Sequence, residues 1–200
     1  MDERALIVGA VASVPESVAL WEGIRAHFAE VGAPMDYTLY SNHERLTDQL
    51  MDGEVDVAWL SPLAYVRARR RAGAMVVPLI VGDTDRDVRS HVVMRIHERP
   101  FDLGALRGMT LAVGSRDSAC SRVLPLFFLR QAGVDLDALK VLAVELDVGK
   151  GGQTGRADRE VLRTVREGRA EAGVVSDRAW SAAQREGEAE GLRVVWSSPT

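Results

Sequence analysis

Apolar and polar positions along this chain follow two different patterns, and segments with one pattern alternate with segments with the other. Continuous apolar runs such as Ala5–Val11 and Val55–Leu60 are typical of strands that are covered on both faces. Between these runs apolar residues recur every three or four positions, as at Trp21, Ile24 and Phe28, which is typical of amphipathic helices. The alternation of the two patterns predicts an α/β fold.

The same patterns locate the elements along the chain. Strands are expected at residues 5–11, 35–40, 55–60, 75–81, 88–96, 110–113, 141–146, 170–175 and 192–196. Helices are expected from a start at Ser13–Glu16 to Gly32, from Ser41 or Asn42 to Gly53, and from Leu63 to Gly73, and over residues 103–106, 121–132, 157–168 and 177–185. We expect Ser13 to cap the first helix, with its inward face formed by Val18, Leu20, Trp21, Ile24 and Phe28.

A change in composition predicts two lobes. Between Asp83 and Arg89 the sequence passes from apolar to charged residues and back, as expected where the chain crosses from one lobe to the next. We predict a first α/β lobe at residues 1–84, a second α/β lobe at 85–196, and a tail at 197–200 that returns toward the first.

Composition then excludes several classes of function. With 200 residues, 46% of them hydrophobic, the chain can bury a substantial core. A formal net charge of -4 argues against nucleic acid as a partner. No apolar stretch approaches the roughly 20 residues that a membrane-spanning helix needs, so we expect no membrane insertion. The single cysteine, Cys120, excludes an internal disulfide bond.

The amino terminus leaves the compartment open. Met1–Arg4 leads directly into the first apolar strand, without the basic and long apolar regions of a secretory signal peptide. Two alternatives follow. Either a signal peptide has been removed and the protein faces the periplasm or the exterior, or the chain acts in the cytoplasm.

The stretch Leu111–Arg130 is the strongest candidate for a binding site. A short apolar strand ends at Gly114, a turn rich in small polar residues follows, and a helix begins within that turn. The first amides of a helix lack backbone partners and lie at the positive end of its dipole, so with Ser118, Cys120 and Ser121 beside them they could hold an anion. The alternative is an ordinary Ser or Asp cap with no ligand.

Known catalytic and metal-binding motifs are missing from the sequence. There is no His-Glu-x-x-His, no paired Cys-x-x-Cys and no Gly-x-Ser-x-Gly. The four histidines are scattered over unrelated elements, so we expect no metal site, no cofactor and no catalytic residues. Cys120 as a nucleophile is the enzyme alternative, because a helix N-terminus lowers the pKa of a thiol.

Five segments resemble a known family in the family's order. They are GEVDVAWLSPLAYVRARRRAGAMVVPLIV (53–81), RSHVVMR (89–95), SRDSACSRVLP (115–125), EGRAEAGVVSDRAW (167–180) and LRVVWSSP (192–199). These segments are similar to the phosphate, phosphite and phosphonate substrate-binding proteins of ABC transporters. The resemblance implies a two-lobed type II periplasmic-binding fold that closes on a small anionic ligand, such as a phosphate or phosphonate, and an ABC permease as partner. Because the family's chain continues after this point, the return to the first lobe is expected to be truncated here.

The resemblance also assigns residues. It places Ser118 and Cys120 at the family's anion-binding Ser-Thr-Ser turn, with Ala119 in place of the threonine and Ser121 directly after them. It places His43 where many members carry a ligand-contacting tyrosine, near Tyr40, and puts Ser61 in the Trp-x-Gly/Ser-Pro turn. Asp177 matches an acidic position near the hinge. We expect these residues, together with Ser13, to bind the ligand.

Departures from the family pattern keep other functions open. Asp158 and Arg159 occupy positions where the family often has a His followed by an acidic residue, and Val88 stands where phosphonate binders can have a tyrosine. We expect Arg159 to reverse the charge beside a ligand amine, which favours an anionic ligand over an aminoalkylphosphonate. An enzyme on the same fold, of the menaquinone-pathway or pyrimidine-precursor type, is the main alternative, with Cys120 and His43 as its reactive residues.

Two further expectations concern partners. An effector domain separated from a DNA-binding part is a weaker alternative, and the absence of a helix-turn-helix segment before Ala5 argues against DNA binding by this chain alone. Strand edges left unpaired by a truncated first lobe would favour a homodimer.

Overall fold

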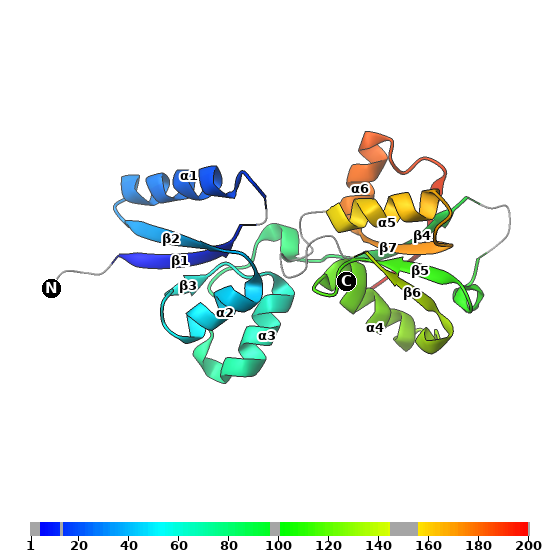
Figure 1. Cartoon of the computed structure of the whole chain (residues 1–200), viewed down its shortest axis with the longest axis horizontal. Helices are drawn as coiled ribbons and strands as arrows, with labels where there is room; N and C mark the ends of the chain where they lie inside the picture. Colours follow the sequence, from blue (N-terminus) through cyan, green and yellow to red (C-terminus); the bar gives the residue numbers. More distant parts are fainter. Residues whose placement is uncertain (1–4, 13, 97–100, 145–155, 200) are drawn as a thin grey trace. The chain divides into compact units, whose positions relative to one another are not determined.

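The computed structural model describes residues 5–12, 14–96, 101–144 and 156–199 (Figure 1). These residues form two compact units that divide between Ile80 and Val81. The boundary predicted after residue 84 lies four residues later, in the polar segment that follows the apolar run at residues 75–81. Residues 197–199 lie in the second unit, where the Ser198 amide donates to the Ser90 carbonyl at 2.8 Å.

Unit 1 is a small parallel sheet with helices on both faces (Figure 1). Its strands are β1 (Leu6–Val11), β2 (Met35–Tyr40) and β3 (Val57–Ala58), in the order β2-β1-β3. Its helices are α1 (Ser17–Glu30), α2 (His43–Met51) and α3 (Pro62–Ala72), followed by the 3-10 turn η1 (Gly73–Met75).

The two faces of β1 build two separate clusters in unit 1. Val8 and Ala10 pack with Trp21 of α1, and between them on the other face Gly9 lies against Leu46 of α2. Val11 packs with Leu46 and Val55 on that second face. Because neighbouring residues of a strand point to opposite faces, a continuous apolar run is what a strand covered on both sides requires.

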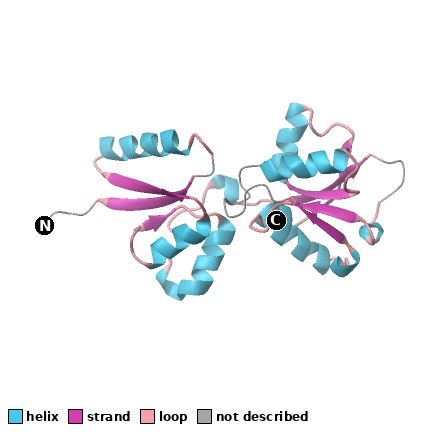
Figure 2. Cartoon of the chain, viewed as in Figure 1, coloured by secondary structure: helices cyan, strands magenta, loops and turns pink. Residues whose placement is uncertain are grey.

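Unit 2 contains a larger mixed sheet, drawn in magenta in Figure 2. Its strand order is β6-β5-β7-β4-β8. Its strands are β4 (Ser90–Arg95), β5 (Thr110–Val113), β6 (Lys140–Ala143), β7 (Ala172–Ser176) and β8 (Leu192–Ser197). Its α-helices are α4 (Leu124–Gln131), α5 (Arg156–Arg166) and α6 (Asp177–Glu186). Short helical turns are η2 (Asp83–Asp85), η3 (Leu103–Leu106), η4 (Ala119–Val123) and η5 (Leu136–Ala138).

Helices cover both faces of the sheet in unit 2. On one face Val161 and Val165 of α5 and Trp180 of α6 pack on β4, β5 and β7. On the other face Leu129 of α4 packs on Leu111 and on neighbouring strand residues. Strands β5, β6 and β7 run parallel, whereas β4 is antiparallel to both of its neighbours, β7 and β8. The carboxyl ends of β5 and β7 therefore meet at one edge of the sheet, and the amino end of β4 lies beside them.

The predicted strand at residues 75–81 is wrong. The chain makes the η1 turn there and then runs without regular structure. Val76 is half-buried, but most of the apolar side chains are exposed, from 61% at Val81 to 84% at Met75. The predicted strand at 55–60 is also shorter, since β3 has only two residues. An apolar run shows that a segment is able to pair in a sheet, but a strand forms only where a neighbouring strand supplies the hydrogen bonds.

The first helix also differs from expectation. Its N-cap position is Glu16, which makes no side-chain cap, and Ser13 lies outside the described residues. Trp21 is buried, but Val18 and Leu20 are exposed. A sheet of three strands is narrow, so it covers only part of the helix face that the period predicts.

Candidate functional site

A tight turn joins the end of β5 to the helix that follows it. The amide of Gly114 donates to the carbonyl of Ser121 at 2.9 Å, which folds the start of the helix back onto the strand. A Cβ atom at position 114 would overlap with the Ser121 hydroxyl and lie 2.9 Å from the Ser121 Cβ. Gly114 is therefore required by this close approach.

The hydroxyls of Ser118 and Ser121 lie inside this turn and bind each other. Ser118 is 2% exposed and Ser121 is 1% exposed. Ser118 Oγ accepts from the Ser121 amide at 3.1 Å, and the two hydroxyl oxygens are 2.6 Å apart. Ser118 is thus the N-cap residue, and both hydroxyls have partners within the protein.

The helix begins as the π-helical turn η4 and continues as α4. Ala119 and Cys120, in the first turn, are half-buried. Because early amides of a helix lack intrahelical acceptors, this turn presents N–H groups and the positive end of a dipole. These donors are the ones expected from the sequence, whereas the inward orientation of the serine side chains was not predicted.

Beneath the turn lies a buried carboxyl group, that of Asp158 in the first turn of α5. It is 3% exposed, and its Oδ2 accepts from the Ser176 hydroxyl at 2.7 Å. Its Oδ1 has no hydrogen-bond partner in the described part of the chain. Burial raises the pKa of Asp158 above its ordinary value, although hydrogen bonds from Ser176 and Ser121 oppose that rise. Sequence reasoning noted Asp158 only as a departure and left it out of the site.

More polar groups gather at the same sheet edge from β4 and β8. The Ser90 hydroxyl donates to the Cys120 carbonyl at 2.6 Å, and the Ser90 amide donates to Ser198 Oγ at 2.9 Å. His91 Nδ1 lies 2.8 Å from Ser197 Oγ. Burial lowers the pKa of His91, and the charge of Asp177 opposes this shift. The edge therefore joins strands and helices of unit 2 through short polar contacts.

The thiol of Cys120 is a poor nucleophile. Burial raises the pKa of Cys120 to about 11 together with the nearby carboxylates of Asp158, Asp177 and Asp85, whereas Arg178 opposes the rise. The thiolate form is the reactive one, so at neutral pH this cysteine stays protonated. The enzyme alternative expected the opposite, a pKa lowered by the helix N-terminus, and that expectation is wrong.

Of two further positions named from the sequence, Asp177 lies near this edge of the sheet and Arg159 lies on the surface. Asp177 is half-buried at the start of α6, where its amide donates to the Arg89 carbonyl at 3.0 Å. Arg159 is exposed and pairs with Glu186 at 2.6 Å and Glu188 at 3.8 Å. Glutamates on the surface thus pair with its charge, and the expectation that Arg159 lies beside the ligand stays a prediction.

The remaining predicted residues lie in unit 1. Tyr40 ends β2 and is half-buried, His43 begins α2, and the buried Ser61 caps α3 by accepting from the Ala64 amide at 3.3 Å. Ser13 lies outside the described residues. The structure thus holds Ser118, Ala119, Cys120, Ser121 and Asp177 together in unit 2. It holds Tyr40, His43 and Ser61 in unit 1, and the ligand contacts of both sets stay predictions.

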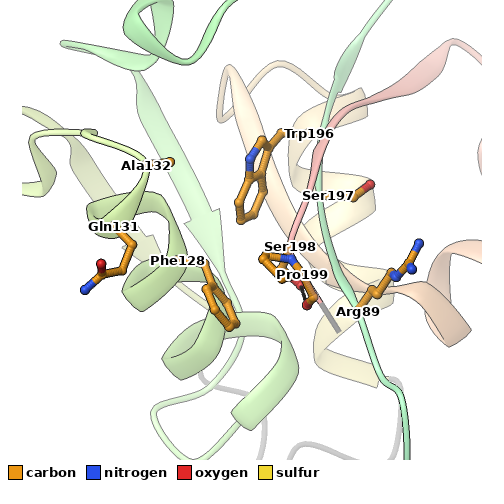
Figure 3. A pocket seen from close by; sticks show the side chains of 8 residues that line it. All are labelled: Arg89, Phe128, Gln131, Ala132, Trp196, Ser197, Ser198 and Pro199. Atoms are coloured by element: carbon orange, nitrogen blue, oxygen red, sulfur yellow. Dashed lines mark hydrogen bonds between the residues drawn. The ribbon is translucent and has the colours of Figure 1, made fainter.

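Each unit has an open hollow on its surface. In unit 2 a hollow of about 600 Å³ lies between α4 and the end of β8, with Trp196 and Phe128 on its walls (Figure 3). In unit 1 a groove of about 590 Å³ is lined by Tyr40 together with charged residues of α2 and Arg71. Arg71 pairs there with Asp48. Of the predicted site residues that the structure describes, Tyr40 alone lines one of these two hollows.

Metal and membrane-spanning sites are absent from the described residues. No three His, Cys, Asp or Glu side chains there come close enough to hold a metal ion. No helix in those parts of the chain is both long and apolar enough to span a bilayer.

Comparison with known proteins places this arrangement in a family. The family model described as ABC transporter, phosphonate, periplasmic substrate-binding protein matches residues 8–200. No curated protein matches the chain.

Solved structures share the fold at low identity. PhnD1 from Prochlorococcus marinus, in complex with methylphosphonate, is 19% identical with a TM-score of 0.66, over 98% of this chain and 73% of that one. XAC2383 from Xanthomonas citri, bound to ATP, is 18% identical with a TM-score of 0.70, over the same shares of 98% and 73%. The aliphatic sulphonate binding protein SsuA from Escherichia coli is 15% identical with a TM-score of 0.60, over 98% of this chain and 61% of that one.

These likenesses confirm the type II periplasmic-binding fold. They also confirm the resemblance drawn from the sequence, and they support a binding protein over an enzyme on the same fold. Binding proteins of this kind take up small ligands and deliver them to ABC permeases. Because the family model matches residues 8–200, the chain belongs to the family of periplasmic substrate-binding proteins of phosphonate ABC transporters.

Proposed function

We propose that this protein binds a small oxyanion of the phosphonate or phosphate type and presents it to an ABC permease. The family match over residues 8–200 carries the proposal. The turn after β5 supports it, because a helix N-terminus at the carboxyl end of a parallel strand is a common anion site. In this proposal the amides of Ala119 and Cys120 hold the anion, and the hydroxyls of Ser118 and Ser121 shape the turn and supply a further donor.

Unit 1 supplies the second group of ligand contacts in this proposal. Tyr40 and His43 can donate or accept hydrogen bonds, and Ser61 lies at the start of α3, where its cap leaves early amides available. Asp177 in unit 2 favours a ligand that also carries a hydrogen-bond donor. The ligand class is therefore a small molecule with one oxyanion head.

A thermal-shift and calorimetry series tests the proposal. Methylphosphonate, ethanesulfonate and inorganic phosphate are compared with acetate and with ethanol, which lacks the charge. A bound oxyanion at about 100 times its dissociation constant should stabilise the protein by about 2.7 kcal/mol. If no tetrahedral oxyanion binds or raises the melting temperature more than acetate does, the proposed ligand class is wrong.

A further inference from the structure

The hydroxyls of Ser118 and Ser121 form a short chain of hydrogen bonds next to a buried acid. The two oxygens are 2.6 Å apart, and either one can be the donor. The Ser121 hydroxyl also forms a hydrogen bond with the carboxyl of Asp158 that lowers the pKa of this group. A hydroxyl has a single proton to donate, so the direction of the chain decides which end keeps a free donor.

The charge on Asp158 sets this direction. An ionised carboxylate only accepts hydrogen bonds, so it draws the Ser121 proton inward, and Ser118 then donates to Ser121 Oγ. Neither hydroxyl proton is left for a ligand. A protonated Asp158 donates to Ser121 Oγ instead, Ser121 donates to Ser118 Oγ, and the Ser118 proton is free to point to an anion.

We propose that anion binding at the Ser118–Ser121 turn is coupled to a proton held by Asp158, which turns the serine hydroxyls toward the ligand. The inference rests on the proposed function. Asp158 Oδ1 is buried and without a hydrogen-bond partner in the described chain, so the ionised carboxyl would keep an unpaired oxygen that shares its charge. Leaving a charged oxygen buried and unpaired is costly, and a proton removes that cost.

The charges around the turn also favour anion binding when Asp158 is protonated. Asp158, Asp177 and Asp85 all act on the Cys120 thiol in this turn, and Asp158 acts most strongly of the three. Arg178 opposes them, and His91 and Arg89 lie on the neighbouring strand edge. At the Cys120 thiol three carboxylates thus act against one arginine. Neutralising Asp158 removes the strongest repulsion.

Affinity measured against pH tests the coupling. Ethanesulfonate is the sharper probe because a sulfonate carries no titrating proton near neutral pH, and methylphosphonate is measured at pH values where it is fully ionised. For wild type we expect affinity to fall as pH rises through the raised pKa of Asp158, by about tenfold per pH unit where Asp158 is ionised in the free protein. Calorimetry in two buffers of different ionisation enthalpy should show about one proton taken up on binding in that range.

Variants separate Asp158 from its neighbours. Asp158→Asn has an amide that donates to Ser121 while its carbonyl accepts from Ser176, so it should keep the wild-type affinity of low pH at every pH. Asp137→Asn removes the same charge from an exposed site, and its affinity should depend on pH as that of wild type does. His91→Gln should also keep the slope.

Each outcome decides the proposal. A wild-type affinity that does not change with pH, a proton uptake of zero, or a slope that survives in Asp158→Asn or disappears in His91→Gln overturns the inference alone. If Asp158→Asn does not fold, the proton uptake of wild type still decides. No binding of either anion at any pH overturns the proposed function, and this inference with it.

Discussion

At the scale of a single residue, Ser118 both caps a helix and takes part in a chain of hydrogen bonds. Its oxygen caps the helix after β5, and its proton belongs to a chain that leads to Asp158. A lone hydroxyl that caps a helix contributes to stability, whereas one that also contacts a ligand contributes to affinity as well. The two contributions are separable by measuring both in one variant.

Ser118→Ala is expected to lower stability and affinity together. Loss of an N-cap costs about 0.5–2 kcal/mol of unfolding free energy, and loss of the ligand donor should weaken oxyanion binding by about tenfold or more. Chemical denaturation and calorimetry measure the two effects. Ser181→Ala, an exposed serine on α6, is the control and should change neither. Unchanged affinity in Ser118→Ala would remove Ser118 from the site.

Cys120 is expected to react slowly with alkylating agents. A pKa of about 11 in place of 9.0 lowers the thiolate fraction at neutral pH by about 100-fold. Iodoacetamide labelling of the folded protein, compared with labelling in denaturant, measures the difference. Rapid labelling of the folded protein would show that the thiol is activated and would favour the enzyme alternative again.

At the scale of elements, the contact between α5 and β7 depends on a missing side chain. A Cβ atom at Gly173 would lie 2.6 Å from Val165 Cγ2 and 2.7 Å from Val161 Cγ1. The helix therefore packs directly on the strand backbone. This contact positions both Asp158, at the start of α5, and Ser176, at the end of β7.

Gly173→Ala should lower the free energy of unfolding by about 1–3 kcal/mol, because both valines must move. Gly23→Ala is the matched control. Gly23 lies within α1, and a methyl group there would have no neighbouring atom within 4 Å, so alanine should stabilise by about 0.5–1 kcal/mol. Melting curves of the two variants should shift in opposite directions, and an unchanged Gly173→Ala curve would contradict the packing described here.

The whole molecule should lose stability as Asp158 ionises. Its folded pKa is raised, so the folded state binds more protons than the unfolded state above the unfolded pKa of about 4. Stability therefore falls as pH rises from there through the folded pKa. Asp158→Asn should melt at a higher temperature than wild type at pH 8, with the difference shrinking toward pH 4. A lower melting temperature for Asp158→Asn at pH 8 would contradict this sign.

Self-association is a second prediction at this scale. The edge strand β3 has two residues, and the exposed apolar run from Met75 to Val81 includes Leu79 at 71% and Ile80 at 76%. Unpaired edges and apolar patches favour association with another copy. Sedimentation velocity should show concentration-dependent dimers that Leu79→Lys weakens and Leu20→Lys, on α1, leaves unchanged. A monomer at every concentration would make the homodimer prediction wrong.

Much of the fold was predictable because the signals are local. Asn42 and Ser61 cap α2 and α3 as their positions indicate, and the strands at 110–113 and 35–40 have the predicted bounds. The site was predictable in part, since the Gly114–Ser121 turn is visible in the sequence. Asp158 was not, because it is far from the turn along the chain and only the packing of α5 brings it there.

The amino-acid sequence by itself determined most of the order of strands and helices, the small polar turn after β5 and the membership of the binding-protein family. Periodicity, caps and motifs are properties of neighbouring residues, so they can be read without the fold. Tertiary structure alone decided that the run at 75–81 stays unpaired, that Ser118 and Ser121 face inward and that an acid lies beneath them. Strand pairing, burial and the charge around a group depend on residues distant in the chain, and those distances are set only when the chain has folded.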